Sequence, residues 1–374
     1  GPDMLRTGDG TAFSLGSFNI RIGRNDLDAP DVRRMTITTD SGYILDLLPS
    51  KGLSVGRFRT PKGDVFWEIP VRGLISPESF DPLAPMLVNG EPVKSLRWIE
   101  NFAGAIELLG LSNWGMPVKD EDSDTILPLH GEASQIPVET CEVLADQRYV
   151  AAVASYQVRD RWWADLANIE RPWYRRGSPQ WTITRHVVLD TETRQLQVLD
   201  AIRNDGPVAR RPDWGYHVQL RPEPGARYVI PSARTTSRAG GTVAEGFQEW
   251  YPAPDPTVRT ERGYVHSGVP VYPDPVGGNA VETVAEYPTR PNVRVVMPVA
   301  PYMLSWFSCG GTGGTEFDRP EDPDGSYMTV GWDGFGPEFG ASSLDHDRAG
   351  DPTVAEPDLE PGDTRLLHIA VTQE

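Results

Sequence analysis

Glycine and proline recur through this chain at a frequency that long helices do not tolerate. The 374 residues include 37 glycines and 35 prolines, which together make up nearly a fifth of the sequence. Proline removes a backbone hydrogen-bond donor and glycine weakens the interior of a helix or strand. The composition therefore favours many turns and short strands, and no window predicts an amphipathic helix longer than about three turns.

Apolar and β-branched runs bounded by turn residues supply the expected strands. A turn at residues 190–194 has hairpin length and joins two of them. The pattern predicts an all-β fold of stacked, mainly antiparallel sheets, with residues 11–374 as a single domain. Residues 1–10, which open with Gly1, Pro2 and Asp3, are expected to be a cloning remnant and flexible N-terminus. The expected strands include residues 35–40, 43–48, 149–156, 181–189, 195–202 and 293–297.

Charge and cysteine content exclude several classes of partner and cofactor. The formal net charge of −18 argues against binding to nucleic acid or to an anionic membrane, because phosphate groups require clustered lysine and arginine. Cys141 and Cys309 match no zinc spacing, and we expect neither a metal nor a cofactor. No apolar stretch has transmembrane length and no signal-peptide pattern is present, so we expect a cytoplasmic protein. The sequence leaves a homo-oligomer open.

Two of only six histidines lie close to turn glycines. His130 lies in the segment 127–137, where Gly131 and Glu132 follow it, and His217 lies in the segment 213–220 after two large aromatic residues. Imidazole is the side chain best suited to proton transfer near neutral pH, so these residues are candidates for a site that moves protons on a sugar-like substrate. The alternative is that both are hydrogen-bonded structural residues.

Tryptophan residues offer candidate sugar-stacking surfaces. The chain contains eleven of them, and indole rings pack well against the apolar faces of pyranoses. The alternative is that they fill the core of a large β domain. A separate cluster, Asp345, His346 and Asp347, is better interpreted as a solvated loop than as a metal site, because adjacent residues in a strand point to opposite faces. The candidate stacking residues are Trp114, Trp214, Trp306 and Trp332.

Several motifs, taken in order, resemble the galactose mutarotase-like superfamily, and most closely its aldose-1-epimerase-like branch. The Leu-His-Gly signature is at residues 129–131, and the motif at 216–219 resembles a Tyr-His-hydrophobic-Asn motif of that branch. The resemblance covers most of residues 35–372. Further segments that carry it are 53–56, 65–68, 75–82, 98–111 with Gly115, 305–306, 327–333 and 359–363.

The resemblance implies a β-supersandwich with a sugar site on its concave sheet. His217 corresponds to the general acid that protonates the ring oxygen, and His130 corresponds to the histidine that helps to hold the substrate. The carboxylate that takes the proton from the anomeric hydroxyl corresponds best to Asp333, with Glu338 as a competitor. We expect His130 and His217 to face the same pocket, although they are distant in the sequence.

The chain departs from the family pattern at three expected site positions. Glu132 stands where the family usually has arginine, Gln219 where it has asparagine, and Asp333 where it has glutamate. Loss of a guanidinium removes a fixed set of donors. We therefore expect Glu132 and Gln219 to bind substrate, with an altered substrate preference, and Glu132 is also a candidate second proton-transfer group. Asn113 is a further candidate for substrate binding.

The function expected from these features is that of a sugar mutarotase, an isomerase of the aldose 1-epimerase type. An isomerase or lyase on the same scaffold is an alternative. Glycoside cleavage by two carboxylates, Glu132 with Asp333 or Glu338, is another. A non-catalytic carbohydrate-binding protein is the alternative of a different class. The residues do not define which sugar or anomer is bound.

Overall fold

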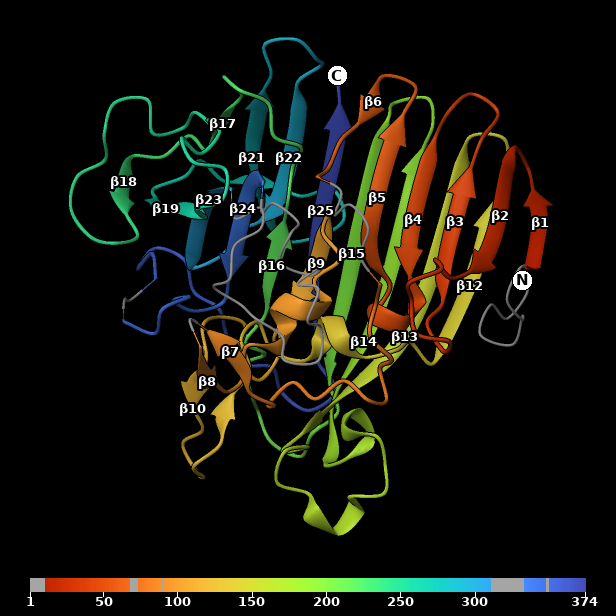
Figure 1. The fold of residues 1–374 in the computed structure, drawn as a ribbon, viewed down its shortest axis with the longest axis vertical. Coiled ribbons are helices and arrows are strands. Elements are labelled where there is room, and N and C mark those ends of the chain that lie inside the picture. Colours follow the sequence, from red (N-terminus) through yellow and green to blue (C-terminus); the bar gives the residue numbers. More distant parts are fainter. Residues whose placement is uncertain (1–10, 68–72, 89, 311–332, 348–349) are drawn as a thin grey trace.

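The computed structural model describes residues 11–67, 73–88, 90–310, 333–347 and 350–374, and within these ranges it is almost entirely β (Figure 1). The only helical segments in the described ranges are short 3-10 turns. None of the helices there is long and apolar enough to cross a membrane. The expectation for residues 1–10 lies outside the described residues. Within the described ranges, the all-β prediction is confirmed.

Among the described residues, one large sheet contains twelve strands, all paired antiparallel. Its two halves are distant in the sequence, and they meet where a short strand of the N-terminal half pairs with one from the middle of the chain. In spatial order the strands are β1 (Thr11–Leu15), β2 (Phe18–Gly23), β3 (Arg34–Thr38), β4 (Ile44–Leu48), β5 (Ser54–Thr60), β9 (Ile106–Leu109), β16 (Gly215–Val218), β24 (Gly334–Gly340), β23 (Tyr302–Cys309), β19 (Thr260–Ser267) and β18 (Arg234–Ser237), with β6 (Gly63–Asp64) paired to β5.

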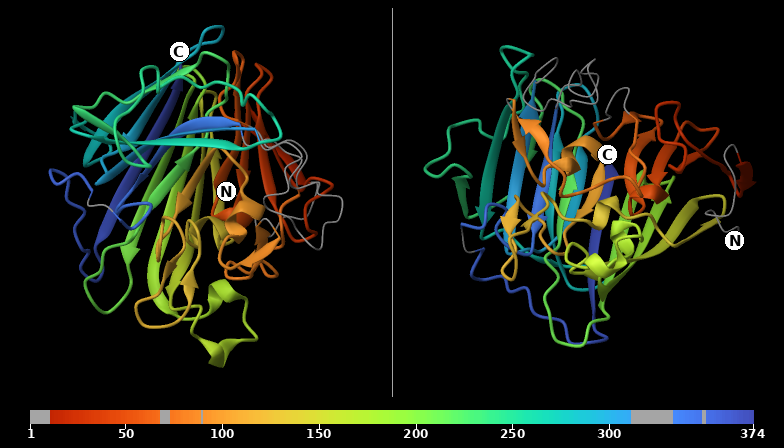
Figure 2. Two further views of the ribbon diagram at one scale, coloured as in Figure 1. Left: turned by 60° about the vertical axis from the view of Figure 1, so that its left-hand side comes forward. Right: turned by 60° about the horizontal axis from the view of Figure 1, so that its bottom comes forward.

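The second sheet contains nine strands in the described part of the chain and stacks against the first (Figure 2). The turn at residues 190–194 joins two of its longest strands as expected. In spatial order the strands are β12 (Thr140–Ala145), β13 (Tyr149–Asp160), β14 (Ser178–Asp190), β15 (Gln195–Asn204), β25 (Thr364–Gln373), β22 (Val293–Pro298), β21 (Asn279–Glu286) and β17 (Arg227–Val229), with β20 (Tyr272–Pro273) paired to β21.

The main core lies between the two sheets. Strand β13 alternates between buried and less buried residues along most of its length, as a strand with one face on a core should. A fully buried ion pair crosses this core: Arg185 Nε lies 2.7 Å from Asp200 Oδ1, and Tyr216 donates from its hydroxyl to Asp200 Oδ2 at 2.5 Å. Tyr216 belongs to β16 and faces this core, so its neighbour His217 faces the opposite side of the sheet.

A second apolar layer covers that opposite side. Strands β9, β16, β23 and β24 are buried along their whole length, so both of their faces are covered. The cover comes from an apolar cluster that includes Trp98, Trp114 and Trp306. Of the short elements, η2 (Arg97–Asn101) contributes Trp98 to this cluster. The other short elements in the described ranges are β7 (Met86–Val88), β8 (Glu91–Val93), β10 (Val118–Lys119), β11 (Ile126–Leu127), η1 (Pro49–Lys51), η3 (Ala133–Gln135), η4 (Leu166–Asn168) and η5 (Trp173–Arg175).

Candidate active site

A cavity of about 270 Å³ lies between the second apolar layer and the central strands of the twelve-stranded sheet. Its wall combines aromatic and aliphatic side chains with a small number of ionisable groups, which is the usual composition of a small-molecule pocket. It is lined by Leu96, Trp98, Ile99, Phe102, Met116, Leu129, His130, His217, Arg238, Arg259, Glu261, Trp306, Glu338 and Leu344.

Strand register brings three ionisable residues into one row beside this cavity. In the antiparallel ladder His217 of β16 is directly opposite Glu338 of β24 on one side and Glu107 of β9 on the other. Side chains that are directly opposite in such a ladder project from the same face of the sheet. The row therefore stands on the face away from the main core, and all three residues are buried.

His217 is enclosed by aromatic rings. Its ring centre lies 4.9 Å from those of Phe102 and Trp306, and 5.4 Å from that of Trp98. The rings of His130 and His217 are 5.9 Å apart, and His217 Nε2 lies 3.6 Å from Glu338 Oε1. The structure thus brings together two imidazoles and a carboxyl group that come from three separate parts of the chain.

The Leu-His-Gly segment holds His130 in a strained but well-supported conformation. Both His130 (φ 58°) and Gly131 (φ 69°) adopt left-handed backbone angles. A side chain at position 131 would place its Cβ 2.6 Å from Gly110 Cα, so glycine is required there. Asn113 supports the same loop, because its Nδ2 donates to the carbonyls of Met116 (2.9 Å) and Pro128 (3.1 Å).

The tautomer of His130 follows from one hydrogen bond. Its Nδ1 lies 2.8 Å from the carbonyl oxygen of Trp114, which can only accept, so Nδ1 must carry the proton. Burial lowers the pKa of His130 to about 4, so the ring is neutral at pH 7. A neutral ring protonated at Nδ1 leaves the Nε2 lone pair as an acceptor. His130 is therefore suited to accept a proton or a hydrogen bond.

Burial keeps the carboxyl group of Glu338 protonated, whereas it keeps His130 from gaining a second proton. Desolvation, with help from nearby Glu261, raises the pKa of Glu338 to about 8, although Arg238 acts in the other direction. Burial, and then the neighbouring His130, lowers the pKa of His217 well below its usual value. At neutral pH the pair therefore consists of a neutral imidazole and a protonated carboxyl group. This distribution differs from the sequence-based expectation that His217 carries the donated proton.

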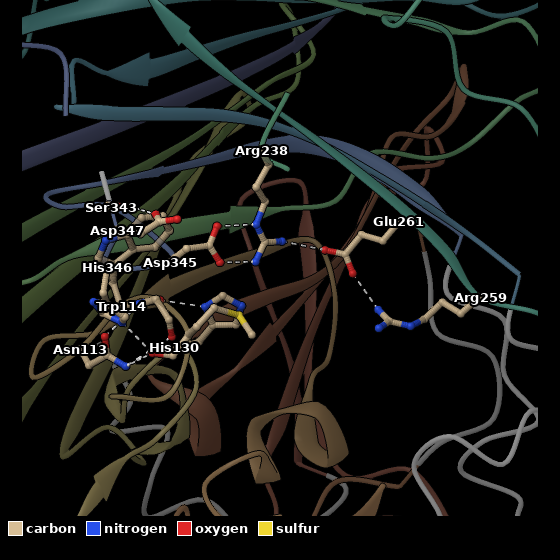
Figure 3. Close-up of polar contacts among 12 residues, drawn as sticks. Asn113, Trp114, His130, Arg238, Arg259, Glu261, Ser343, Asp345, His346 and Asp347 are labelled. Atoms are coloured by element: carbon tan, nitrogen blue, oxygen red, sulfur yellow. Dashed lines mark hydrogen bonds and ion pairs between the residues drawn. The ribbon is translucent and has the colours of Figure 1, made fainter. Parts of the chain in front are cut away.

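A chain of charges forms the rim of the cavity (Figure 3). Arg238, which follows β18, makes a two-pronged contact with Asp345 through Nε (2.7 Å) and Nη2 (2.6 Å). Glu261 of β19 accepts from Arg238 Nη1 at 3.2 Å and from Arg259 Nη1 at 2.7 Å. Sequence reasoning missed Arg238, Arg259 and Glu261, because nothing in their local sequence distinguishes them from surface charges. Asp345 was interpreted as part of a solvated loop and in fact anchors Arg238.

Glu338 takes the position that the sequence analysis gave to Asp333. Asp333 accepts a hydrogen bond from the Gly310 amide at 3.0 Å and does not line the cavity. Asp333 precedes Glu338 by five positions, which in extended chain correspond to roughly 16 Å. A signal for Glu338 exists in the sequence of β24, where Gly334, Gly336 and Gly340 alternate with it on one face. That face carries glutamate as its only side chain at these four positions.

Glu132 does not line the cavity either, which corrects the expectation of a role in substrate selection or proton transfer. Its side chain turns into the loop beside it: Oε1 accepts from the amides of Leu111 (3.2 Å) and Ser112 (3.0 Å), and Oε2 accepts from Ser112 Oγ at 2.5 Å. Burial raises its pKa. Glu132 therefore ties the segment that contains His130 to the loop that follows Gly110.

The remaining predicted binding residues divide between cavity and scaffold. Trp306 lines the cavity. Trp214 is buried elsewhere, with its Nε1 donating to Glu356 Oε1 at 2.8 Å, because it shares the core-facing side with Tyr216. Gln219 is fully buried and donates from Nε2 to the Asp333 carbonyl at 3.0 Å. Neither residue lines the cavity, and Trp332 lies outside the described residues.

Two other candidates have structural roles. Asn113 supports the His130 loop, as described above, and does not line the cavity. Trp114 lies flat over two glycines of the sheet, since a Cβ at Gly215 or Gly340 would come within 2.3 Å of its ring. Its Nε1 donates to the Ser342 carbonyl at 2.9 Å. Trp114 therefore forms part of the floor that carries His130 rather than a stacking surface.

The two-sheet fold is similar to that of galactose mutarotase-like proteins of known structure. The chain belongs to the family described as Domain of unknown function (DUF4432), whose model matches residues 30–286, more than half of the chain. A comparison with curated proteins gave no match.

Solved structures support the fold assignment. A proposed aldose 1-epimerase from Klebsiella pneumoniae superposes with a TM-score of 0.70 at 15% identity, over 100% of this chain and 86% of that one. A galactose mutarotase-like protein from Clostridium acetobutylicum gives 0.53 at 11% identity, over 95% and 98%. A galactose 1-epimerase from Lactobacillus acidophilus gives 0.52 at 10% identity, over 96% and 99%. At these identities the likeness establishes the fold alone.

Proposed function

We propose that this protein is a carbohydrate isomerase of the aldose 1-epimerase type, which opens and recloses a pyranose ring. The observation that carries the proposal is the convergence of Glu338, His217 and His130 on one cavity of about 270 Å³. Mutarotation requires an acid and a base on opposite sides of one carbon centre. Here burial keeps a carboxyl group protonated and an imidazole neutral in the same pocket, which separates the two roles.

The chemistry can be written with these groups alone. Glu338 passes its proton to His217 Nε2, the imidazolium donates that proton to the ring oxygen, and the C1–O5 bond breaks with its electron pair going to O5. His130 Nε2 takes the proton from the anomeric hydroxyl as the C1=O1 double bond forms. The aldehyde rotates about its bond to C2, and the ring closes by the same steps in reverse. No proton or electron is left over, because the acid and the base exchange roles on closure.

The aromatic walls fit this class of substrate. Trp98 and Trp306 both contact the cavity, and both rings lie against His217. Indole faces pack well against the apolar C–H face of a pyranose, so they hold the ring next to the two imidazoles. The charged rim of Arg238, Glu261 and Arg259 supplies donors and acceptors for hydroxyl groups at the mouth.

Anomeric exchange measured by proton NMR tests the proposal directly. Freshly dissolved single anomers of a panel of neutral, deoxy and acidic sugars are followed with and without protein. We expect faster equilibration of the anomeric signals for at least one sugar, with no new compound. Glu338→Gln should slow that reaction by about 100-fold or more, whereas Asp333→Asn, a matched carboxylate-to-amide change outside the cavity, should leave it near the wild-type rate.

The outcomes separate the alternatives. A new product in place of anomeric exchange would mean isomerisation, elimination or glycoside cleavage and would overturn the proposal. Sugar binding with no turnover for any member of the panel would indicate a carbohydrate-binding protein instead. An inactive Asp333→Asn variant beside an active Glu338→Gln variant would return the proton-transfer role to Asp333.

A further inference from the structure

Glu107 is the third member of the ionisable row and has no part in the proposed chemistry so far. It lies on β9, directly opposite His217 on β16. Its neighbours Ile106 and Leu108 face the main core, whereas Leu109 belongs to the second apolar layer. Glu107 therefore projects from the same face as His217, and both side chains are buried.

One carboxylate oxygen of Glu107 is fully engaged. Lys51 Nζ lies 3.1 Å from Glu107 Oε1, and the amide of Ala103 donates to the same oxygen at 3.3 Å. Both partners of the ion pair are buried, and Lys51 also donates to the Ser134 carbonyl at 2.9 Å. A buried cation and these donors fix the orientation of the Glu107 carboxylate, with Oε1 turned towards Lys51.

The other oxygen, Glu107 Oε2, is buried without a hydrogen-bond partner among the described residues, and the same holds for His217 Nδ1. Leaving a buried polar atom unpaired is unfavourable. These two atoms are chemically complementary, since a carboxylate oxygen only accepts and a neutral imidazole can donate from Nδ1. They belong to residues that face each other across one rung of the ladder.

We propose that Glu107 is a positioning residue for His217. Its Oε2 accepts the hydrogen bond of His217 Nδ1–H, directly after a small side-chain rotation or through one water molecule. This bond fixes the tautomer in which the His217 Nε2 lone pair points towards Glu338. The His217 ring can then receive the Glu338 proton at Nε2 while Glu107 stabilises the resulting cation, and Lys51 balances the Glu107 charge.

The tautomer is a property of the protein alone, so its measurement does not depend on the proposed function. In protein labelled with ¹⁵N-histidine, two-bond ¹H–¹⁵N correlations distinguish Nδ1–H from Nε2–H rings. The His217 signal is assigned as the one that disappears in His217→Gln. We expect Nδ1–H in the wild type. His130 is an internal reference, since the Trp114 carbonyl holds it as Nδ1–H.

Glu107→Gln should reverse the His217 tautomer. Lys51 and the Ala103 amide both donate to the Oε1 position, so the glutamine must place its carbonyl oxygen there. Its amide NH₂ then occupies the Oε2 position and donates to His217 Nδ1, which leaves the proton on Nε2. The His130 signal should not change. Glu142→Gln, a change of the same kind at an exposed position of β12, should alter neither ring.

The catalytic consequence rests on the proposed function. For a sugar that the wild type turns over, Glu107→Gln should lower kcat by roughly 10–100-fold, the usual effect of removing a partner that orients an imidazole, with little change in KM. Wild-type His217 found as Nε2–H would overturn the proposal even if Glu107→Gln did not fold. An unchanged tautomer in a folded Glu107→Gln variant would also overturn it. Absence of sugar turnover would count against the proposed function only.

Discussion

Replacing Glu338 by glutamine should change how the stability of the protein depends on pH. Burial raises the pKa of Glu338 from 4.5 to about 8 in the folded state. Between these values the folded protein holds a proton that the unfolded chain has released. A group with a raised pKa therefore contributes stability that is present in full below pH 4.5 and is lost as the pH rises towards 8. Glutamine keeps the shape of the side chain and removes this dependence.

The window from pH 6.5 to 8 isolates this contribution. The lowered pKa values of His130 and His217 add a dependence that fades as the pH rises past about 6.5, where the unfolded imidazoles lose their protons, and both proteins carry these two histidines. Where the folded and unfolded states differ by one bound proton, the free energy of unfolding changes by about 1.4 kcal/mol per pH unit. Because Glu338 is only half protonated at pH 8, the free energy of unfolding of the wild type should fall by about 1.5–2 kcal/mol more than that of Glu338→Gln across the window.

Urea titrations at four pH values between 6.5 and 8, read by tryptophan fluorescence and circular dichroism, measure the two slopes. Other groups with raised pKa values, including Glu132, are present in both proteins and cancel in the difference. The argument would be refuted if the free energy of unfolding changed across the window by the same amount in both proteins, within about 0.5 kcal/mol. That result would mean that Glu338 is already ionised at pH 6.5 in the folded protein, and the carboxyl group could not be the proton donor.

Three further predictions concern the same pocket. His217→Ala should lose about 100-fold or more in anomeric exchange while its circular dichroism stays native, and near-full activity would remove His217 from the mechanism. The wild-type kcat/KM should rise as His130 loses its proton near pH 4 and fall near pH 8 as Glu338 loses its proton, so a flat profile up to pH 9.5 contradicts the assignment. Glu132→Ala should lower the free energy of unfolding by about 1–3 kcal/mol, because it leaves buried backbone donors unpaired, and should not change the preference between neutral and acidic sugars. A changed preference would restore the selective role that the sequence analysis gave to Glu132.

The strands that the sequence predicted are those whose signal is local. Strands β13, β14 and β15 are long, alternate between faces and are joined by short turns, so period and turn chemistry are enough to identify them. Strands β9 and β16 each have four residues, all buried, and therefore show no alternation. Their pairing also joins distant parts of the chain, which no local pattern encodes.

The candidate site likewise contains residues that the sequence could identify and residues that depend on pairing between distant strands. The two histidines could be found because imidazoles are rare in this chain and each lies within two residues of a glycine. The choice between Asp333 and Glu338 could not be made, because it depends on which residue of β24 is opposite His217. The place of Glu132 could not be predicted for a related reason: its carboxylate accepts from Leu111 and Ser112, which lie about twenty residues earlier in the chain.

The row formed by Glu107, His217 and Glu338 runs across strands that are covered on both faces, so three ionisable groups are buried side by side on three adjacent strands. Such an arrangement does not favour stability, because each group loses hydration and hydrophobic residues of similar size would cost less. The opposite face of the same strands holds the packed core between the sheets, and strand alternation keeps the two functions apart. Substitutions in the row should consequently alter proton transfer and the pH dependence of stability while the two-sheet packing persists. The register of three short strands is then what distinguishes a proton-transfer site from an ordinary apolar layer in this fold.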